Sequence, residues 1–246
     1  KLSLETAHLN NADTLATDQG IEGKALVVRA SDLDNSSGAL RADTTLNIDS
    51  HGSLDNRRGL VSSAQALAVR DGAASRTLAV LNDDGTLIAG EQLDLVAASL
   101  AGGRVLSQRD LAISLAGALE NRSEITANRN ATLNTAGALI NSGTLQAGHT
   151  LAVTTASLDN RAGGQIIAPE LRVAATDSHT LTNRGLIDGG DIRAYSRKYG
   201  QTYNDFAANL AAGGEQSVAI STSTPDWMTL SEAQVAALAS NITISV

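Results

Sequence analysis

The amino-acid sequence predicts an all-β protein, a right-handed parallel β-helix in which short strands wind into stacked coils. Three observations carry this prediction: a unit that recurs about every twenty residues, apolar residues that come in pairs two positions apart, and turn-forming residues after each pair. A repeat of this length belongs to the solenoid range, in which each unit buries its apolar face by stacking on its neighbours. Residues 139–160, LINSGTLQAGHTLAVTTASLDN, show one complete unit.

The unit is anchored by the pattern Leu-x-Asn. The intact copies are Leu9/Asn11, Leu33/Asn35, Leu54/Asn56, Leu119/Asn121, Leu139/Asn141, Leu158/Asn160 and Leu181/Asn183. Two further copies are degenerate, because Leu81 precedes Asp83 and Leu100 precedes Gly102 at the Asn position. Since equivalent residues of stacked coils line up, we expect the Asn side chains to form a ladder of amide hydrogen bonds. We expect the ladder to break at the two degenerate copies.

The apolar pairs predict short strands with one inward face. Leu46/Ile48, Leu67/Val69 and Leu151/Val153 are examples, and residues two apart point to the same side of a strand. Gly, Ser, Asn or Asp follows each pair, which places turns at the corners of a coil. The leucine-rich repeat has a similar period but requires Asn three residues after a Leu-x-Leu pair. Here the next fixed Leu comes five residues after the pair, which favours the parallel β-helix.

The composition excludes several classes of partner and site. The chain has 246 residues, 2% aromatic residues, no Cys and a formal charge of −8. The absence of Cys excludes disulfides and thiolate metal sites, and it is compatible with secretion through an oxidising compartment. The acidic balance argues against nucleic acid and anionic membrane surfaces as partners. No apolar run reaches the roughly eighteen residues that a transmembrane helix needs.

Composition also divides the chain into three regions. We expect the β-helix repeats in residues 1–194, with the excess of the longest period, Asp71–Arg76, forming a loop at a corner. Residues 195–222 hold an aromatic insert and a further coil. Residues 223–246 hold a linker, a short capping helix from Ser231 to about Ala239, and a terminal strand, Ile242–Val246. Because the chain begins within the repeat pattern, we expect it to be an internal fragment of a longer protein.

Few residues suit catalysis or metal binding. The closest paired carboxylates are Asp83 with Asp84 and Asp188 with Asp191. Polysaccharide lyases and hydrolases built on β-helices use acidic and basic residues from one face, but no third partner type stands at matching positions. The four His residues, none of which has a partner four positions away, are His8, His51, His149 and His179. We therefore expect no catalytic residue, metal or cofactor, and we keep a β-helical carbohydrate-active enzyme as the alternative.

A row of arginines is a first candidate for binding. Each of these arginines directly follows a ladder Asn: Arg57, Arg122, Arg161 and Arg184. A stacked Arg row would suit sulfated or acidic glycans. However, Asp55, Glu120 and Asp159 precede three of the same Asn residues and offset the charge. The pattern therefore favours a solvated face of mixed charge.

The aromatic segment is a second candidate. Every aromatic residue lies after Ala194, and Arg197 and Lys198 lie among the rings. Aromatic side chains with Arg nearby are enriched in recognition surfaces. The candidate binding residues are Tyr195, Arg197, Lys198, Tyr199 and Tyr203. The alternative is that the rings, with Phe206 and Trp227, cover the open end of the solenoid.

The repeats resemble a known family. The units SLDNRAGGQI, ALINSGTLQAG and TLTNRGLIDGGDI are similar to the repeats of filamentous haemagglutinin-type exoproteins, the large secreted partners of two-partner secretion. The likeness covers roughly residues 9–222. The family includes bacterial adhesins and contact-dependent growth inhibition effectors, so the resemblance implies a secreted shaft segment at the bacterial surface. Its implied partners are a receptor on a target cell, protein or glycan, and the outer-membrane transporter of the secretion pair.

Overall fold

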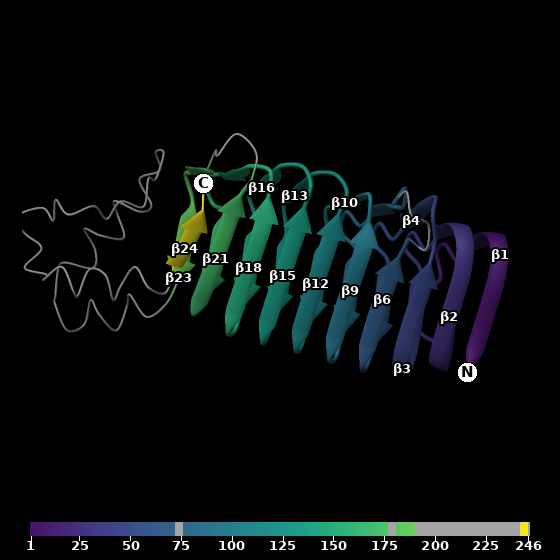
Figure 1. Cartoon of the computed structure of the whole chain (residues 1–246). Coiled ribbons are helices and arrows are strands. Elements are labelled where there is room, and N and C mark those ends of the chain that lie inside the picture. Colours follow the sequence, from purple (N-terminus) through teal and green to yellow (C-terminus); the bar gives the residue numbers. More distant parts are fainter. Residues whose placement is uncertain (72–75, 177–180, 190–241, 246) are drawn as a thin grey trace, which may run out of the picture.

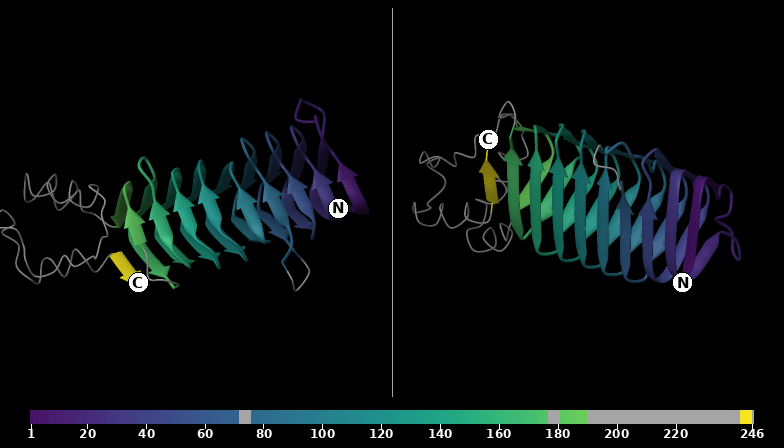
Figure 2. Two further views of the ribbon diagram at one scale, coloured as in Figure 1. Left: turned by 90° about the horizontal axis from the view of Figure 1, so that it is seen from above. Right: turned by 45° about the vertical axis from the view of Figure 1, so that its right-hand side comes forward.

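The structure, a computed structural model, describes residues 1–71, 76–176, 181–189 and 242–245, and in these residues it is all β. Every strand pairs in parallel with the equivalent strand of the next coil, and the coils stack into an elongated β-solenoid (Figure 1). The predicted parallel stacking is confirmed. Figure 2 shows the strands in chain order along the stack, from β1 to β21.

The strand lengths change along the chain. The first three strands are long and bend around corners: β1 (Leu2–Asn10), β2 (Ile21–Asp34) and β3 (Ala39–Asp49). The later coils are divided into three short strands each. The next strands are β4 (Ser53–Asp55), β5 (Leu60–Ser63), β6 (Ala66–Arg70), β7 (Ala79–Leu81), β8 (Thr86–Ala89), β9 (Gln92–Ala97), β10 (Ser99–Ala101), β11 (Arg104–Ser107) and β12 (Asp110–Leu115). The remaining strands are β13 (Leu119–Asn121), β14 (Glu124–Ala127), β15 (Asn130–Thr135), β16 (Leu139–Asn141), β17 (Thr144–Ala147), β18 (Thr150–Thr155), β19 (Leu158–Asn160), β20 (Gln165–Ala168), β21 (Glu170–Ala175), β22 (Leu181–Asn183), β23 (Leu186–Gly189) and β24 (Ile242–Ser245).

Three parallel sheets enclose the core. The anchor sheet contains β4, β7, β10, β13, β16, β19 and β22, and the second sheet contains β5, β8, β11, β14, β17, β20 and β23. The broad sheet contains β6, β9, β12, β15, β18, β21 and β24. The long β2 and β3 join these sheets at their N-terminal edge. Alternate residues of every strand therefore point into one narrow interior.

Aliphatic side chains fill that interior in columns. One column of the broad sheet is Leu26, Leu46, Leu67, Leu93, Leu111, Ala131, Leu151 and Leu171, which pair from coil to coil. All of these residues are at most 2% exposed. No aromatic ring is needed, because the sheets are close enough for Leu, Ile and Val to fill the space. The apolar pairs of the sequence are the inward positions of these strands.

One anchor lies elsewhere than the sequence predicted. Val80 pairs with both Leu54 and Leu100 on the anchor sheet, and it is fully buried, whereas Leu81 faces outward. The prediction that Leu81 and Asp83 form the anchor of this coil is therefore wrong. The anchor is Val80 with Asn82. The physical reason is that Val fills an inward position as well as Leu does. When two candidate anchors stand one residue apart, only the pairing of the strand shows which of them faces the interior.

The C-terminal region lies mostly outside the described residues. This applies to the aromatic insert, the linker and the predicted helix from Ser231. The last described strand, β24, lies in register beside β21, with Ile242 opposite Leu171 and Ile244 opposite Val173. Of the strand expected at Ile242–Val246, the described residues Ile242–Ser245 therefore occupy the position of a further rung on the broad sheet.

Candidate functional site

A buried asparagine stands at the end of the anchor-sheet strand, or directly after it, in every described coil but one. The chain turns outward after this residue and re-enters the second sheet, so the Asn side chain lies inside the corner. The ladder position is held by Asn11, Asn35, Asn56, Asn82, Gly102, Asn121, Asn141, Asn160 and Asn183 in successive coils. The eight Asn residues are at most 6% exposed. Asn82 was missed in the sequence because its anchor is Val rather than Leu.

Each ladder amide from Asn11 to Asn160 donates two hydrogen bonds to the following coil. Nδ2 of Asn141 donates to Oδ1 of Asn160 at 2.8 Å and to the carbonyl of Gln165 at 3.2 Å. The Asn-to-Asn distance is 2.7–2.8 Å at all six steps. An amide has two N–H donors, and both must be satisfied when it is buried. The Asn amides of the corner are therefore hydrogen-bonded within the protein, which indicates a structural role.

The ladder is interrupted once, at Gly102. Here the turn is short, and the backbone of Gly102 and Gly103 adopts φ angles of 65° and 70°. A Cβ on Gly103 would lie 1.8 Å from the backbone oxygen of Asn82. The main chain thus passes through the space that an Asn side chain fills elsewhere. The amide of Asn82 instead donates to the carbonyl of Arg104 at 3.3 Å.

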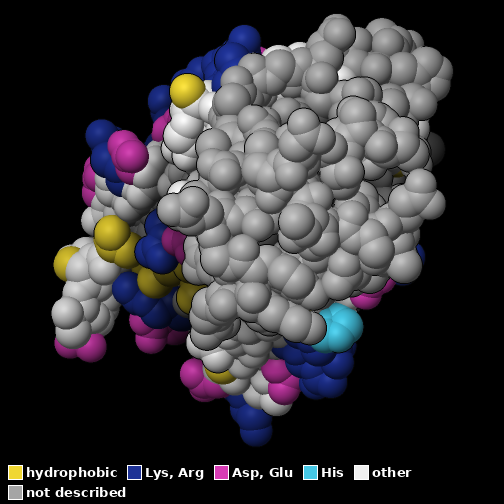
Figure 3. All heavy atoms as spheres, turned by 90° about the vertical axis from the view of Figure 1, so that its left-hand side faces the viewer, with side chains coloured by type: hydrophobic (Ala, Val, Ile, Leu, Met, Phe, Trp, Pro, Cys, Tyr) yellow, Lys and Arg dark blue, Asp and Glu magenta, His cyan; other side chains and the backbone are white. Residues whose placement is uncertain are grey.

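A border of paired charges lines the outside of this corner. The ion pairs are Arg57–Asp55 at 2.5 Å, Arg122–Glu120 at 2.9 Å, Arg161–Asp159 at 3.2 Å, Arg161–Glu120 at 3.5 Å and Arg184–Asp159 at 2.7 Å. The hydrogen bond from Arg57 holds the pKa of Asp55 below its ordinary value. Figure 3 shows basic and acidic side chains interspersed around the described part of the end view. The Arg row is therefore neutralised by its neighbours.

Those residues considered for catalysis or metal binding that the structure describes do not converge. Asp83 covers Gly102, Asp84 lies in a turn at a φ of 57°, and Asp191 is outside the described residues. His8 lies 3.2 Å from Asp32 on an exposed surface. The other His residues are separate from it: His51 and His149 lie at other corners, and His179 is outside the described residues. Within the described ranges, no group of three or more His, Cys, Asp or Glu side chains is placed to hold a metal ion.

The candidate binding residues Tyr195, Arg197, Lys198, Tyr199 and Tyr203 all lie outside the described residues. The same holds for Phe206 and Trp227. No helix of the described ranges has the length and hydropathy to cross a membrane.

A parallel β-solenoid with a continuous aliphatic interior and a buried Asn corner is a structural repeat protein, in which the coil itself is the repeated unit. The haemagglutinin repeat model matches the chain three times, at residues 1–58, 56–123 and 124–223. The chain belongs to the haemagglutinin repeat family. Comparison with curated proteins gave no match, and comparison with solved structures gave none either.

Proposed function

We propose that this chain is an extracellular shaft segment of a secreted bacterial adhesin or growth-inhibition effector. In this role it spaces or presents a receptor-binding region to a target cell. Its partners are then a cell-surface receptor, protein or glycan, and the outer-membrane transporter through which such exoproteins leave the cell. The membership in the haemagglutinin repeat family supports this proposal.

The single observation that carries the proposal is the unbroken stacking of the coils. The ladder positions from Asn11 to Asn183 are separated by eight steps, and parallel strands stack at about 4.8 Å. The described coils therefore extend over roughly 40 Å. Because each coil contacts only its neighbours, length is added without a change in the fold. A spacer requires this property.

The experiment that tests the shaft role changes the number of coils. The chain is displayed on a bacterial surface between an anchor and a binding domain of known ligand. One variant duplicates residues 139–157, and another deletes residues 119–157, which removes two coils in register. We expect attachment to cells that carry the ligand beneath a thick glycan coat to rise with coil number. Attachment that is independent of coil number would contradict the spacer role.

The enzyme alternative has a separate test. A polysaccharide lyase or hydrolase on this fold would require acids and bases brought together on one face. At the charged corner, Asp55, Glu120 and Asp159 instead pair with arginines of the same border. We expect the chain to release neither reducing ends nor unsaturated products from a panel of polysaccharides. Turnover of any of them would replace the shaft role with an enzymatic one.

A further inference from the structure

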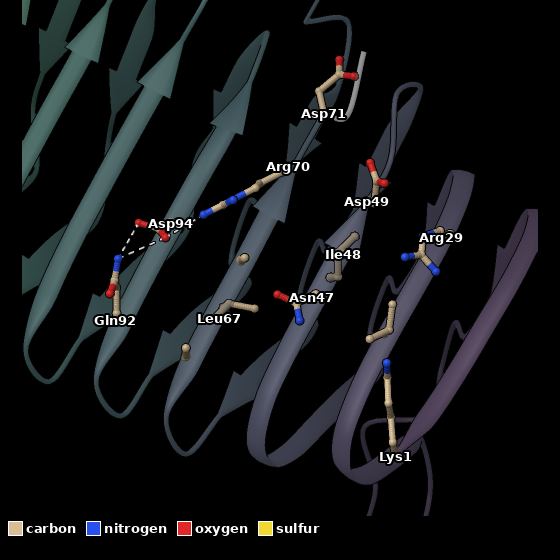
Figure 4. A pocket seen from close by; sticks show the side chains of 13 residues that line it. Lys1, Arg29, Asn47, Ile48, Asp49, Leu67, Arg70, Asp71, Gln92 and Asp94 are labelled. Carbon is tan, nitrogen blue, oxygen red and sulfur yellow. Dashed lines mark hydrogen bonds and ion pairs between the residues drawn. The ribbon is translucent and has the colours of Figure 1, made fainter. Parts of the chain in front are cut away.

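A groove of about 600 Å³ lies on the outer face of the broad sheet near the N-terminal coils. It crosses β2, β3, β6 and β9, and its polar lining includes Arg29, Asn47, Arg70, Gln92 and Asp94 (Figure 4). This volume lies in the range of about 300–1,000 Å³ that is usual for small-molecule sites.

The hollow arises from the residue sizes on β6. Ala66 and Ala68 face outward at the centre of the groove. In register with Ala68 are Asn47 on one side and Asp94 on the other, and Ala66 is flanked by Gln92. Small side chains therefore form the floor, and longer polar side chains on the neighbouring strands form the walls.

The two walls differ in how their side chains are used. Asp94 accepts hydrogen bonds from Arg70 at 2.9 Å and from Gln92 at 3.1 Å, so that wall is internally bonded. On the other side, Arg29 and Asn47 are exposed, and neither side chain makes a hydrogen bond or ion pair with another described residue. Asp49 is the register neighbour of Arg29 and lines the same groove. The Arg29 guanidinium and the Asn47 amide are thus available to a ligand.

We propose that this groove binds an acidic sugar unit of a glycan, with the sugar carboxylate on Arg29. A guanidinium presents paired N–H donors that match a carboxylate. The amide of Asn47 then donates a hydrogen bond to a sugar hydroxyl, and the oxygens of Gln92 and Asp94 accept hydrogen bonds from other hydroxyls. The side-chain charge of Asp94 is offset by Arg70, so it does not repel the bound anion as a lone carboxylate would.

The sheet face disfavours an extended peptide as the occupant. A peptide that binds by strand addition requires free backbone N–H and C=O groups at a sheet edge. The groove lies over the middle of the sheet, where β3 pairs with β2 and with β6 on its two sides, and β6 pairs with β3 and β9. Recognition therefore depends on side chains alone, and these are planar polar groups that suit hydroxyls. The proposal is independent of the spacer role, since it assigns a ligand to the side of the shaft.

The test uses the whole chain and three soluble probes: trigalacturonic acid, its carboxyl-reduced neutral form, and triglutamate. Binding is measured by titration calorimetry or by ligand-observed NMR. We expect trigalacturonic acid to bind at least about tenfold more tightly than either of the other probes, because only it offers both a carboxylate and ring hydroxyls. Equal binding of the neutral sugar or of triglutamate, or no binding of trigalacturonic acid at millimolar concentration, overturns the proposal.

Matched variants locate the site. Arg29→Gln is expected to weaken trigalacturonic acid binding about tenfold. The control is Arg58→Gln at a distant corner, where the exposed Arg58 forms no ion pair with another described residue. Ala68→Leu fills the floor and is expected to abolish binding. Ala152→Leu is its control, because Ala152 occupies the same outward column on β18. Unchanged binding in Arg29→Gln or in Ala68→Leu, with each variant folded by circular dichroism, overturns the assignment. Failure here leaves the dependence of attachment on coil number unaffected.

Discussion

The side-chain amide of Asn56 donates a hydrogen bond to Oδ1 of Asn82 at 2.7 Å. This contact makes Asn82 the fourth member of a ladder that begins at Asn11, and the next position in the stack is Gly102. A second ladder of four runs from Asn121 to Asn183. The corner of the solenoid is therefore held by two side-chain ladders. Between the two ladders, main-chain carbonyls accept the hydrogen bonds that the Asn82 amide donates.

Loss of a ladder amide is expected to destabilise the fold. Asn141→Leu keeps a side chain of four heavy atoms branched at Cγ but removes the donor to Asn160 and the acceptor of the Asn121 amide. A buried polar group without a partner costs about 1–3 kcal/mol. We expect a decrease of this size or larger in the free energy of unfolding, measured by urea denaturation.

The control for this variant is Asn134→Leu. Asn134 faces outward on β15, and its side chain makes no hydrogen bond with another described residue. A surface substitution of this kind is usually within about 0.5 kcal/mol of the parent. If the two variants unfold at the same urea concentration, the ladder does not contribute to stability.

The glycine at the junction of the ladders is expected to tolerate no side chain. Gly103→Ala places a Cβ 1.8 Å from the oxygen of Asn82 at a φ of 70°. The left-handed backbone costs about 1 kcal/mol for Ala, and relief of the overlap adds about 1–3 kcal/mol. We expect a loss of about 2–4 kcal/mol in thermal or urea unfolding.

Gly163→Ala separates these two contributions. Gly163 has a φ of 84°, but nothing lies within 4 Å of its added Cβ. We expect it to lose only the backbone contribution of about 1 kcal/mol. A loss at Gly103 no larger than the loss at Gly163 would show that the overlap is relieved without cost.

The periodic parts of the fold were predictable because one requirement recurs in every coil. An inward position must be aliphatic, and the corner must hold an amide with two donors. Residues such as Leu139 and Asn141 can therefore be assigned from the sequence. The break at Gly102 was predictable too, because Leu100 marks the anchor of that coil and no Asn follows it. Val80 was not distinguishable from Leu81 in this way, because the inward position accepts Val or Leu. Only the pairing of β7 with its neighbours separates these two residues.

The groove was not predictable from the sequence for a related reason. Arg29, Asn47 and Gln92 come from different coils, and they meet only when the coils are stacked in the correct register. The number of residues per coil varies, so a periodic pattern does not give that register. The aromatic segment was visible in the composition, but its residues lie outside the described ranges, and its role in receptor binding remains a proposal.

A carboxylate closes the loop between β6 and β7, and its removal is expected to weaken that corner. Oδ2 of Asp71 accepts hydrogen bonds from the backbone N–H groups of Thr77 and Leu78, the latter at 2.9 Å. Leu78 is fully buried, so Asp71→Ala leaves its N–H unsatisfied at a cost of about 1–3 kcal/mol. Asp71→Asn keeps an acceptor oxygen and is expected to lose less, as measured by urea unfolding. Equal losses in the two variants would indicate that the charge, rather than the hydrogen bonds, matters.

The ion pair between Asp110 and Arg129 predicts a dependence of stability on pH. Arg129 Nε donates to Asp110 at 2.8 Å from the adjacent coil, and this hydrogen bond, opposed by burial, lowers the pKa of Asp110. Because the pKa is lower in the folded chain, the contribution is present above about pH 4 and is lost as the pH falls through the folded pKa. We expect Asp110→Asn to melt at a lower temperature than the parent at pH 7 and at the same temperature near pH 2. The control Asp43→Asn changes an exposed Asp without an ion pair in the described chain and is expected to melt with the parent at both pH values. A difference for Asp110→Asn that persists undiminished at pH 2 would mean that the carboxylate acts through its shape and not through its charge.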